Sequence, residues 1–157
     1  MKIDEIYMSE ALKEARKAAD IDEVPVGCVI VHERKIIARA HNQMRMLHDP
    51  TAHAEMIAIT QAANCLNSER LTGASAYVTI EPCSMCAGAL VLARVKRLIY
   101  GAKDPKTGAC GSVANIVNNK KLNHRISVTS GVLKKECAAI LSKFFKKKRK
   151  KISAVMN

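Results

Sequence analysis

The chain is poor in aromatic residues and contains no long apolar run. Among its 157 residues there is no Trp, and there are only two Phe and three Tyr. Proteins that bind single-stranded nucleic acid by stacking the bases need several aromatic side chains, so this mode of binding is excluded. The longest run of small or apolar residues is far shorter than the ~20 residues that a transmembrane helix needs. We therefore expect no membrane partner.

The sequence also lacks the signals of an exported protein. Asp4 and Glu5 stand where a signal peptide would have its basic and apolar regions. The six Cys residues are spread through apolar segments instead of forming the dense pattern of a disulfide framework. This usage is typical of reduced, intracellular proteins, and we expect the protein to be cytoplasmic.

Acidic residues are few, so the chain is strongly basic. Lys and Arg number 26 against 14 Asp and Glu, which gives a net charge of +12. Much of the excess lies in Lys134–Lys151, with nine basic residues and one acid. Such a run indicates a polyanionic partner, most commonly nucleic acid, or else a solvated tail that aids solubility. We predict one domain at residues 1–149, followed by a basic tail at residues 150–157.

Hydrophobic periodicity predicts helices that alternate with strands. Helical spacing is found at 3–20, 51–66, 83–93 and 133–148, with a further short helix expected at 113–117. Strand-like runs are found at 26–31, 35–40, 76–80, 97–101 and 125–129. We expect a loop at 42–50, after which Thr51 caps a helix. This order predicts an α/β fold, a three-layer α/β/α sandwich around a mixed five-stranded sheet.

Three candidate zinc ligands lie at the predicted starts of two helices. His53 lies near the start of one helix, and Cys83 and Cys86 lie one turn apart at the start of another. Zinc prefers imidazole and thiolate ligands, and a catalytic zinc site uses three protein ligands and leaves a fourth position open. The positive end of a helix dipole also lowers the pKa of a nearby thiol. The pattern therefore predicts a catalytic zinc site at these three residues.

Glu55 follows two residues after His53 and is suited to exchange a proton with a water at the open zinc position. Each feature alone has another interpretation, because an isolated Cys-x-x-Cys can be a redox dithiol and an isolated helix-start Glu is usually solvated. Together, His-x-Glu followed by Pro-Cys-x-x-Cys is the signature of zinc-dependent nucleobase deaminases.

Over about residues 7–149 the sequence resembles the bacterial tRNA-specific adenosine deaminases, members of the cytidine deaminase superfamily. The blocks that carry the resemblance are 23–27, 49–55, 77–89 and 101–108. Cytidine, deoxycytidylate and guanine deaminases share the zinc-binding blocks. The features that favour the tRNA enzymes are the Gly-Ala-Lys-Asp-Pro-Lys-Thr-Gly block, Asn123–Arg125 and Phe144–Phe145.

The resemblance implies a cytidine deaminase-like fold, a homodimer and one zinc ion per subunit, with no organic cofactor. It implies hydrolytic deamination of the wobble adenosine of tRNA, specifically arginine tRNA, to inosine by a zinc-activated water. The substrate partner is then the anticodon stem-loop. The ligand roles fall on His53, Cys83 and Cys86, and the proton-shuttle role falls on Glu55.

The substrate-binding residues expected from the resemblance are Asn42, Asp104, Lys106, Asn123 and His124. An Asn suits contact with a base edge, because its amide offers both donors and an acceptor. Two other functions stay open at this point. A deaminase of a free base or nucleotide shares the zinc site but needs no basic surface. A redox or structural-zinc RNA-binding protein leaves the His-x-Glu motif unexplained, and no fourth ligand stands at short spacing.

Overall fold

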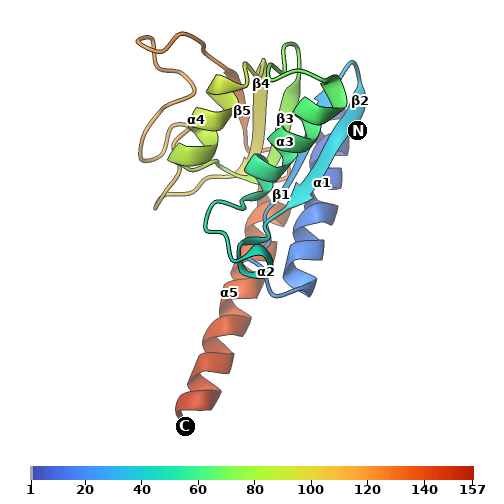
Figure 1. Cartoon of the computed structure of the whole chain (residues 1–157). Helices are drawn as coiled ribbons and strands as arrows, with labels where there is room; N and C mark the ends of the chain where they lie inside the picture. The colour runs from blue at the N-terminus through green and yellow to red at the C-terminus, as the bar shows by residue number, and fades with distance from the viewer. Residues whose placement is uncertain (1) are drawn as a thin grey trace.

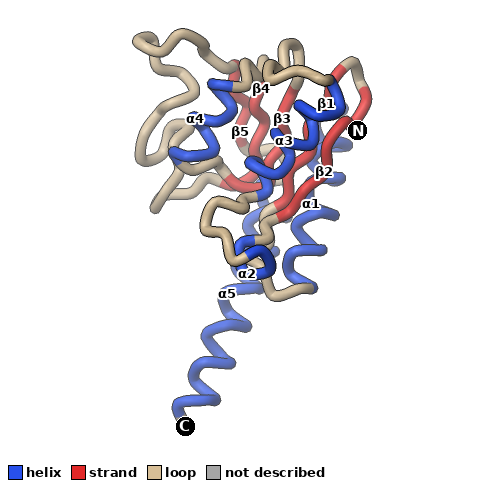
Figure 2. Tube along the Cα trace, viewed as in Figure 1, coloured by secondary structure: helices blue, strands red, loops and turns tan. Residues whose placement is uncertain are grey.

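The computed structural model describes residues 2–157 and has one five-stranded sheet with helices on both faces (Figure 1). The strands are β1 (Gly27–His32), β2 (Lys35–His41), β3 (Ser75–Ile80), β4 (Arg97–Ala102) and β5 (Ser127–Ser130). The helices are α1 (Ile3–Asp20), α2 (Met44–Leu47), α3 (Ala54–Leu66), α4 (Ser84–Leu92) and α5 (Lys134–Met156). The predicted α/β/α sandwich with a mixed sheet is confirmed (Figure 2).

The topology of the sheet decides where α3 and α4 begin. The strand order is β2-β1-β3-β4-β5, with β1 antiparallel to β2 and β3, and with β3, β4 and β5 parallel. Helix α3 directly precedes β3 along the chain, and α4 directly precedes β4. Because β3 and β4 are parallel, the helices that lead into them both begin at the same end of the sheet. Their N-termini can therefore share one site.

Alternation along the strands divides the core into two layers. Cys28, Ile30 and Val78 pack in the layer that also holds the buried alanines of α3 and Leu90 of α4. Val29 and Tyr77 point the other way, into the layer formed with α1 and α5. Because successive side chains of a strand face opposite sides of the sheet, β-branched runs without polar alternation suit strands that are covered on both faces.

The structure corrects three local predictions. The expected loop at 42–50 contains the one-turn helix α2, and residues 113–117 are not helical. Instead, the backbone N–H of Ile116 donates to the carbonyl of Ala109 at 2.9 Å. Thr51 does not cap α3, since the N-cap residue is His53 and the Thr51 hydroxyl donates to Asp49 Oδ1 at 2.7 Å. The same Asp49 oxygen accepts the backbone N–H of Thr51 at 2.8 Å, and such local bonds between side chain and backbone compete with helix capping.

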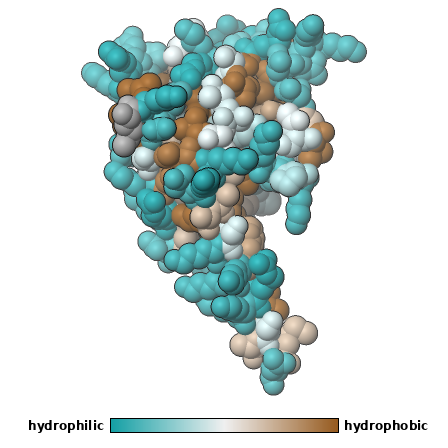
Figure 3. Space-filling view, turned by 180° about the vertical axis from the view of Figure 1, so that it is seen from behind, coloured by the Kyte–Doolittle hydropathy of each residue, from teal (hydrophilic) through white to brown (hydrophobic). Residues whose placement is uncertain are grey.

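Helix α5 is longer than predicted. Its periodicity ends near residue 148, yet the helix runs to Met156 and projects beyond the body of the protein (Figure 1). Lys and Arg are good helix formers, so the basic run continues the helix to its last turns, where Ile152, Val155 and Met156 stay exposed. Hydrophilic side chains cover the upper part of the projecting segment, and paler, more apolar ones lie at its tip (Figure 3). The division into a domain and a tail at residue 150 stays a prediction.

In the part of the chain that the structure describes, no helix combines the length and apolar content needed to cross a bilayer.

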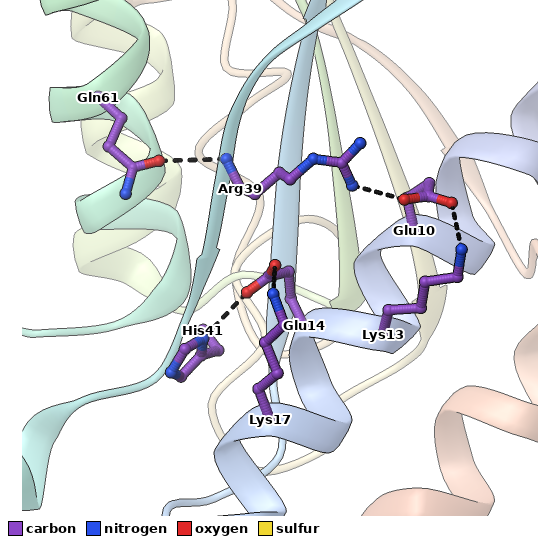
Figure 4. A network of polar contacts seen from close by, with 7 residues as sticks. All are labelled: Glu10, Lys13, Glu14, Lys17, Arg39, His41 and Gln61. Carbon is purple, nitrogen blue, oxygen red and sulfur yellow. Dashed lines mark hydrogen bonds and ion pairs between the residues drawn. The ribbon is translucent and has the colours of Figure 1, made fainter.

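A polar network ties α1 to β2 and α3 (Figure 4). The buried carboxylate of Glu14 accepts a hydrogen bond from Lys17 at 2.8 Å and lies 3.0 Å from Nδ1 of His41. Burial raises the pKa of Glu14, but the contacts with Lys17 and His41 outweigh this effect and the pKa is lowered. Next to it, Arg39 contacts Glu10 and donates its backbone N–H to the Gln61 side chain at 3.1 Å. The network therefore fixes the strand that leads into the loop at 42–50.

We expect Gly27→Ala to lower the free energy of unfolding by about 3 kcal/mol, the upper end of the usual overpacking cost. Helix α1 crosses β1 so closely that a Cβ at Gly27 would lie 1.9 Å from the backbone oxygen of Ala11. A backbone atom cannot move aside as a flexible side chain can, so the helix must shift. Urea denaturation measures the change.

Gly88→Ala is the matched control. Gly88 lies inside α4, and no atom lies within 4 Å of the position that an added methyl group would occupy. An alanine there should raise stability by up to about 1 kcal/mol through helix propensity. Equal effects at the two glycines would contradict the close approach of α1 and β1.

Candidate active site

Two of the candidate ligands occupy helix N-cap positions. His53 is the N-cap residue of α3 and Cys83 that of α4, both with extended backbone angles, and neither side chain makes a capping hydrogen bond. Instead, Nδ1 of His53 lies 3.7 Å from Sγ of Cys83 and 3.5 Å from Sγ of Cys86. The three ligand atoms lie within 4.8 Å of one another and form a group that could hold a metal ion. The structure thus brings the three predicted ligands together.

The three groups strongly perturb one another. The hydrogen bond with Cys86, and then that with His53, lower the pKa of Cys83 to about 3. The bond with Cys83 and burial raise the pKa of Cys86, and the bond to Cys83 raises the pKa of His53. The site therefore favours a thiolate at Cys83, which is the form of cysteine that binds metals.

Glu55 lies in the first turn of α3 and is buried beside the cysteines. Burial raises the pKa of its carboxyl, because removal from water disfavours the charged form. It lines the same cavity as His53 and Cys83. A carboxyl that lines a cavity and has a raised pKa is suited to accept a proton and return it.

The cavity beside these residues has a volume of about 630 Å³. Asn42 lines it and is buried, and its Oδ1 accepts the backbone N–H of Ala54 at 2.8 Å. This bond commits the amide oxygen to the first turn of α3. The group that Asn42 can offer to a ligand is therefore its NH₂ donor.

A second buried acid, Glu81, holds one wall of the cavity. Its carboxylate accepts the backbone N–H groups of Asp104 at 3.1 Å, Cys110 at 3.0 Å and Ser112 at 3.1 Å. We call this segment, residues 103–112, the wall loop. Burial raises the pKa of Glu81, but the hydrogen bonds from Ser112 and from the backbone outweigh it, and the pKa is lowered. Glu81 therefore stays ionised and bound to the loop.

Asp104 and Lys106, expected to contact the substrate, both line the cavity from the wall loop. The Asp104 carboxylate is already used within the loop, where it accepts the backbone N–H of Lys106 at 2.9 Å and the hydroxyl of Thr107 at 2.8 Å. Lys106 is exposed, and among the described residues no ion pair is found for it. The loop therefore offers a cation at the cavity, while Asp104 shapes the loop.

Asn123 and His124 lie outside the cavity. The carbonyl of Asn123 accepts a hydrogen bond from Arg94 at 2.9 Å, and Nε2 of His124 lies 2.8 Å from the carbonyl of Val95. These contacts anchor the segment before β5 to the end of α4. Their assignment as substrate-binding residues stays a prediction.

Sequence reasoning missed most of the apolar wall. The residues concerned are Val24, Val26, Met44, Ile80, Leu141 and Phe145. Met44 belongs to α2, whose single turn is too short to show periodicity. The spacing of the last helix predicted that Leu141 and Phe145 share an apolar face, but spacing does not tell which end of the sheet that face covers.

Comparison with known proteins identifies the family that the sequence motifs resemble. Residues 3–149 match the profile of the MafB19-like deaminases. The chain is 50% identical over 154 residues to a tRNA-specific adenosine deaminase of Bacillus subtilis, covering 98% of this chain and 96% of the relative. It is 48% identical over 148 residues to that of Aquifex aeolicus, covering 94% and 97%.

Solved structures agree on the fold. One, from a study of A-to-I editing by tRNA:A34 deaminases at the wobble position, has a TM-score of 0.84 and 48% identity over 87% of this chain and 99% of its own. A guanine deaminase from Nitrosomonas europaea has a TM-score of 0.77 at 24% identity, covering 89% and 83%, and shares the fold alone. With near-complete coverage at 48–50% identity, the chain belongs to the family of tRNA-specific adenosine deaminases.

Proposed function

We propose that the protein hydrolyses the amino group of the wobble adenosine, A34, in arginine tRNA to give inosine, with one zinc ion per chain. The observation that carries this proposal is the cluster of His53, Cys83 and Cys86, of which His53 and Cys83 line a cavity that Glu55 also lines. Support for the substrate comes from the family, since relatives of this chain are tRNA-specific adenosine deaminases.

The geometry of the cluster fits zinc. A tetrahedral zinc ion with Zn–S bonds of about 2.3 Å and Zn–N bonds of about 2.0 Å holds sulfur and nitrogen about 3.5 Å apart. The two Nδ1–Sγ distances from His53, 3.7 Å to Cys83 and 3.5 Å to Cys86, match that spacing. Two thiolates and one imidazole are ligands that zinc prefers, and a set of three protein ligands would leave one position of a tetrahedral ion open.

When bound, zinc lowers the pKa of a water molecule toward ~7 and so supplies a nucleophile at neutral pH. The chain's own residues do the rest. Glu55 accepts one proton from the attacking water and delivers it to N1 of adenine as the oxygen bonds to C6. It then takes the second proton from the hydroxyl now on C6 and gives it to the amino group, so that the C6–N bond breaks, ammonia leaves and C6 becomes the carbonyl of inosine. An amide in its place could not carry a proton in both directions.

Asn42 and the wall loop orient the base in this proposal. Because Asn42 offers its NH₂ group, it binds an acceptor atom on the edge of the purine. Lys103 and Lys106 are exposed at the cavity and supply cations for the RNA phosphates. A base in an anticodon loop is already partly unstacked, so its entry into the cavity has a small energetic cost.

We further propose a homodimer that needs no organic cofactor and acts in the cytoplasm. The dimer is supported by apolar side chains that stay exposed in one chain, among them Leu92 on α4 at 81% and Val113 at 61%. Large apolar side chains that are this exposed are typical of surfaces that a partner covers.

The substrate class is tested by incubating the protein with an arginine-tRNA anticodon stem-loop, free adenosine and free guanine. We expect inosine and stoichiometric ammonia from the stem-loop and negligible product from the two small molecules, because the basic surface has nothing to bind in them. Mass spectrometry of the digested RNA and an ammonia assay measure both products. Faster deamination of free guanine would instead support a free-base deaminase.

Glu55→Gln separates catalysis from metal binding in the same assay. It should keep zinc and the fold, since Glu55 is not among the three ligands. Its rate should fall at least about 100-fold, the usual range for loss of a general acid–base. A rate near that of the unaltered protein would remove Glu55 from the reaction.

Zinc binding is tested by metal analysis of the purified protein. We expect about one zinc per chain, and none after Cys86→Ala, because two protein ligands do not hold the ion at nanomolar free zinc. Cys65→Ala is the matched control, since Cys65 is exposed at the end of α3 and outside the cluster. Full zinc content in Cys86→Ala would overturn the ligand assignment.

The projecting end of α5 is proposed to contact the tRNA phosphates. Replacing Lys150 and Lys151 with Gln keeps the helix and should weaken stem-loop binding. The slope of the logarithm of the binding constant against the logarithm of the salt concentration should become less steep by up to about 0.7–0.9 for each phosphate contact that is lost. The matched control replaces Lys134 and Lys135, which are exposed at the other end of α5. Identical salt slopes for both pairs would show that the end of α5 only solubilises the protein.

A further inference from the structure

Glu81 is a buried acid that the proposed reaction does not use. It is 2% exposed and lies between β3 and the ligand Cys83. Its position next to the metal cluster makes it the obvious second choice as a proton carrier. The hydrogen bonds around its carboxylate decide whether it can act in that way.

Both carboxylate oxygens are fully engaged by the wall loop. Oε1 accepts the backbone N–H of Asp104 at 3.1 Å and the hydroxyl of Ser112 at 2.5 Å. Oε2 accepts the backbone N–H groups of Cys110 at 3.0 Å and Ser112 at 3.1 Å. An oxygen with two donors has no lone pair left to exchange protons with a substrate, so Glu81 is a structural anchor for the loop.

The loop is also shaped to fit over this carboxylate. A Cβ at Gly108 would lie 2.4 Å from Cδ of Glu81, so only glycine lets the loop come so close. The backbone of the loop in turn pairs with the start of α4, where Ala109 N–H donates to the carbonyl of Pro82 at 2.9 Å. Glu81 therefore connects the metal-ligand segment to the wall that carries Lys103 and Lys106.

We propose that Glu81 is a positioning residue that fixes the wall loop against the cavity, and that it thereby sets the affinity for the substrate and not the rate of the chemical step. The identity of the substrate in this inference rests on the proposed function. The role of Glu81 in fixing the loop does not depend on it. The cations of the loop are held in place before the substrate arrives, so binding does not have to order them.

Glu81→Gln tests the proposal because an amide cannot satisfy both sets of donors. Its oxygen can keep the N–H groups of Cys110 and Ser112, and the Ser112 hydroxyl can turn to accept from the amide. The N–H of Asp104 then faces an NH₂ group and loses its acceptor. The loop should detach at Asp104, next to the cations that line the cavity.

We expect the zinc-loaded Glu81→Gln protein to show about a tenfold higher KM for the stem-loop, the effect of one buried unsatisfied donor, with kcat within about threefold. Ser112→Ala removes one hydrogen bond and leaves the others, so it should give a smaller rise in KM without loss of folding. Glu10→Gln is the matched control, since Glu10 contacts Lys13 and Arg39 and lines no part of the cavity. A fall in kcat with unchanged KM would overturn the proposal, because it would make Glu81 part of the reaction.

Limited trypsin digestion supplies a readout that needs no RNA. Cleavage after Lys103 and Lys106 should be about tenfold faster in Glu81→Gln than in the unaltered protein, and unchanged in Glu10→Gln. Unchanged cleavage and unchanged KM would overturn the proposal. Faster cleavage in a protein that does not deaminate the stem-loop would support the fixing of the loop and contradict only the proposed function.

Discussion

The parallel pairing of β3 and β4 is the constraint on which the site depends. Each strand is preceded by a helix, so the pairing brings the N-termini of α3 and α4 to one end of the sheet. His53 and Cys83 are the N-cap residues of those helices, and their side chains turn toward each other and not toward their own helix backbones. The positive ends of both helix dipoles then lie beside the sulfur of Cys83, and together with the hydrogen bonds from Cys86 and His53 they favour its thiolate form.

Around this centre, buried carboxylates have separate tasks that their hydrogen bonds decide. Glu55 has a raised pKa and faces the cavity, where a proton can be exchanged. Glu81 has a lowered pKa and is bound by the wall loop. Glu23 is equally buried and accepts the backbone N–H of Arg45 at 2.8 Å, which fixes α2 at the cavity. One acid is thus available for chemistry, and the other two build the walls in which it acts.

Sequence patterns predicted the parts of the molecule that repeat or that carry a chemical signature. All five strands and the long helices follow from periodicity, and His53, Cys83 and Cys86 follow from ligand type and spacing. The wall loop and the contribution of α5 to the cavity could not be predicted in this way. They depend on long-range hydrogen bonds, such as that between Glu81 and Ser112, and on the end of the sheet that an apolar helix face covers. Neither property produces a periodic pattern in the neighbouring sequence.

X-ray absorption at the zinc edge of the purified protein tests the central claim most directly. The account predicts a four-coordinate ion with two sulfur neighbours at about 2.3 Å and two nitrogen or oxygen neighbours at about 2.0 Å, of which His53 supplies one. That result would place an open, three-ligand metal centre at the shared N-termini of α3 and α4. Four protein ligands, a third sulfur neighbour or the absence of stoichiometric zinc would contradict it.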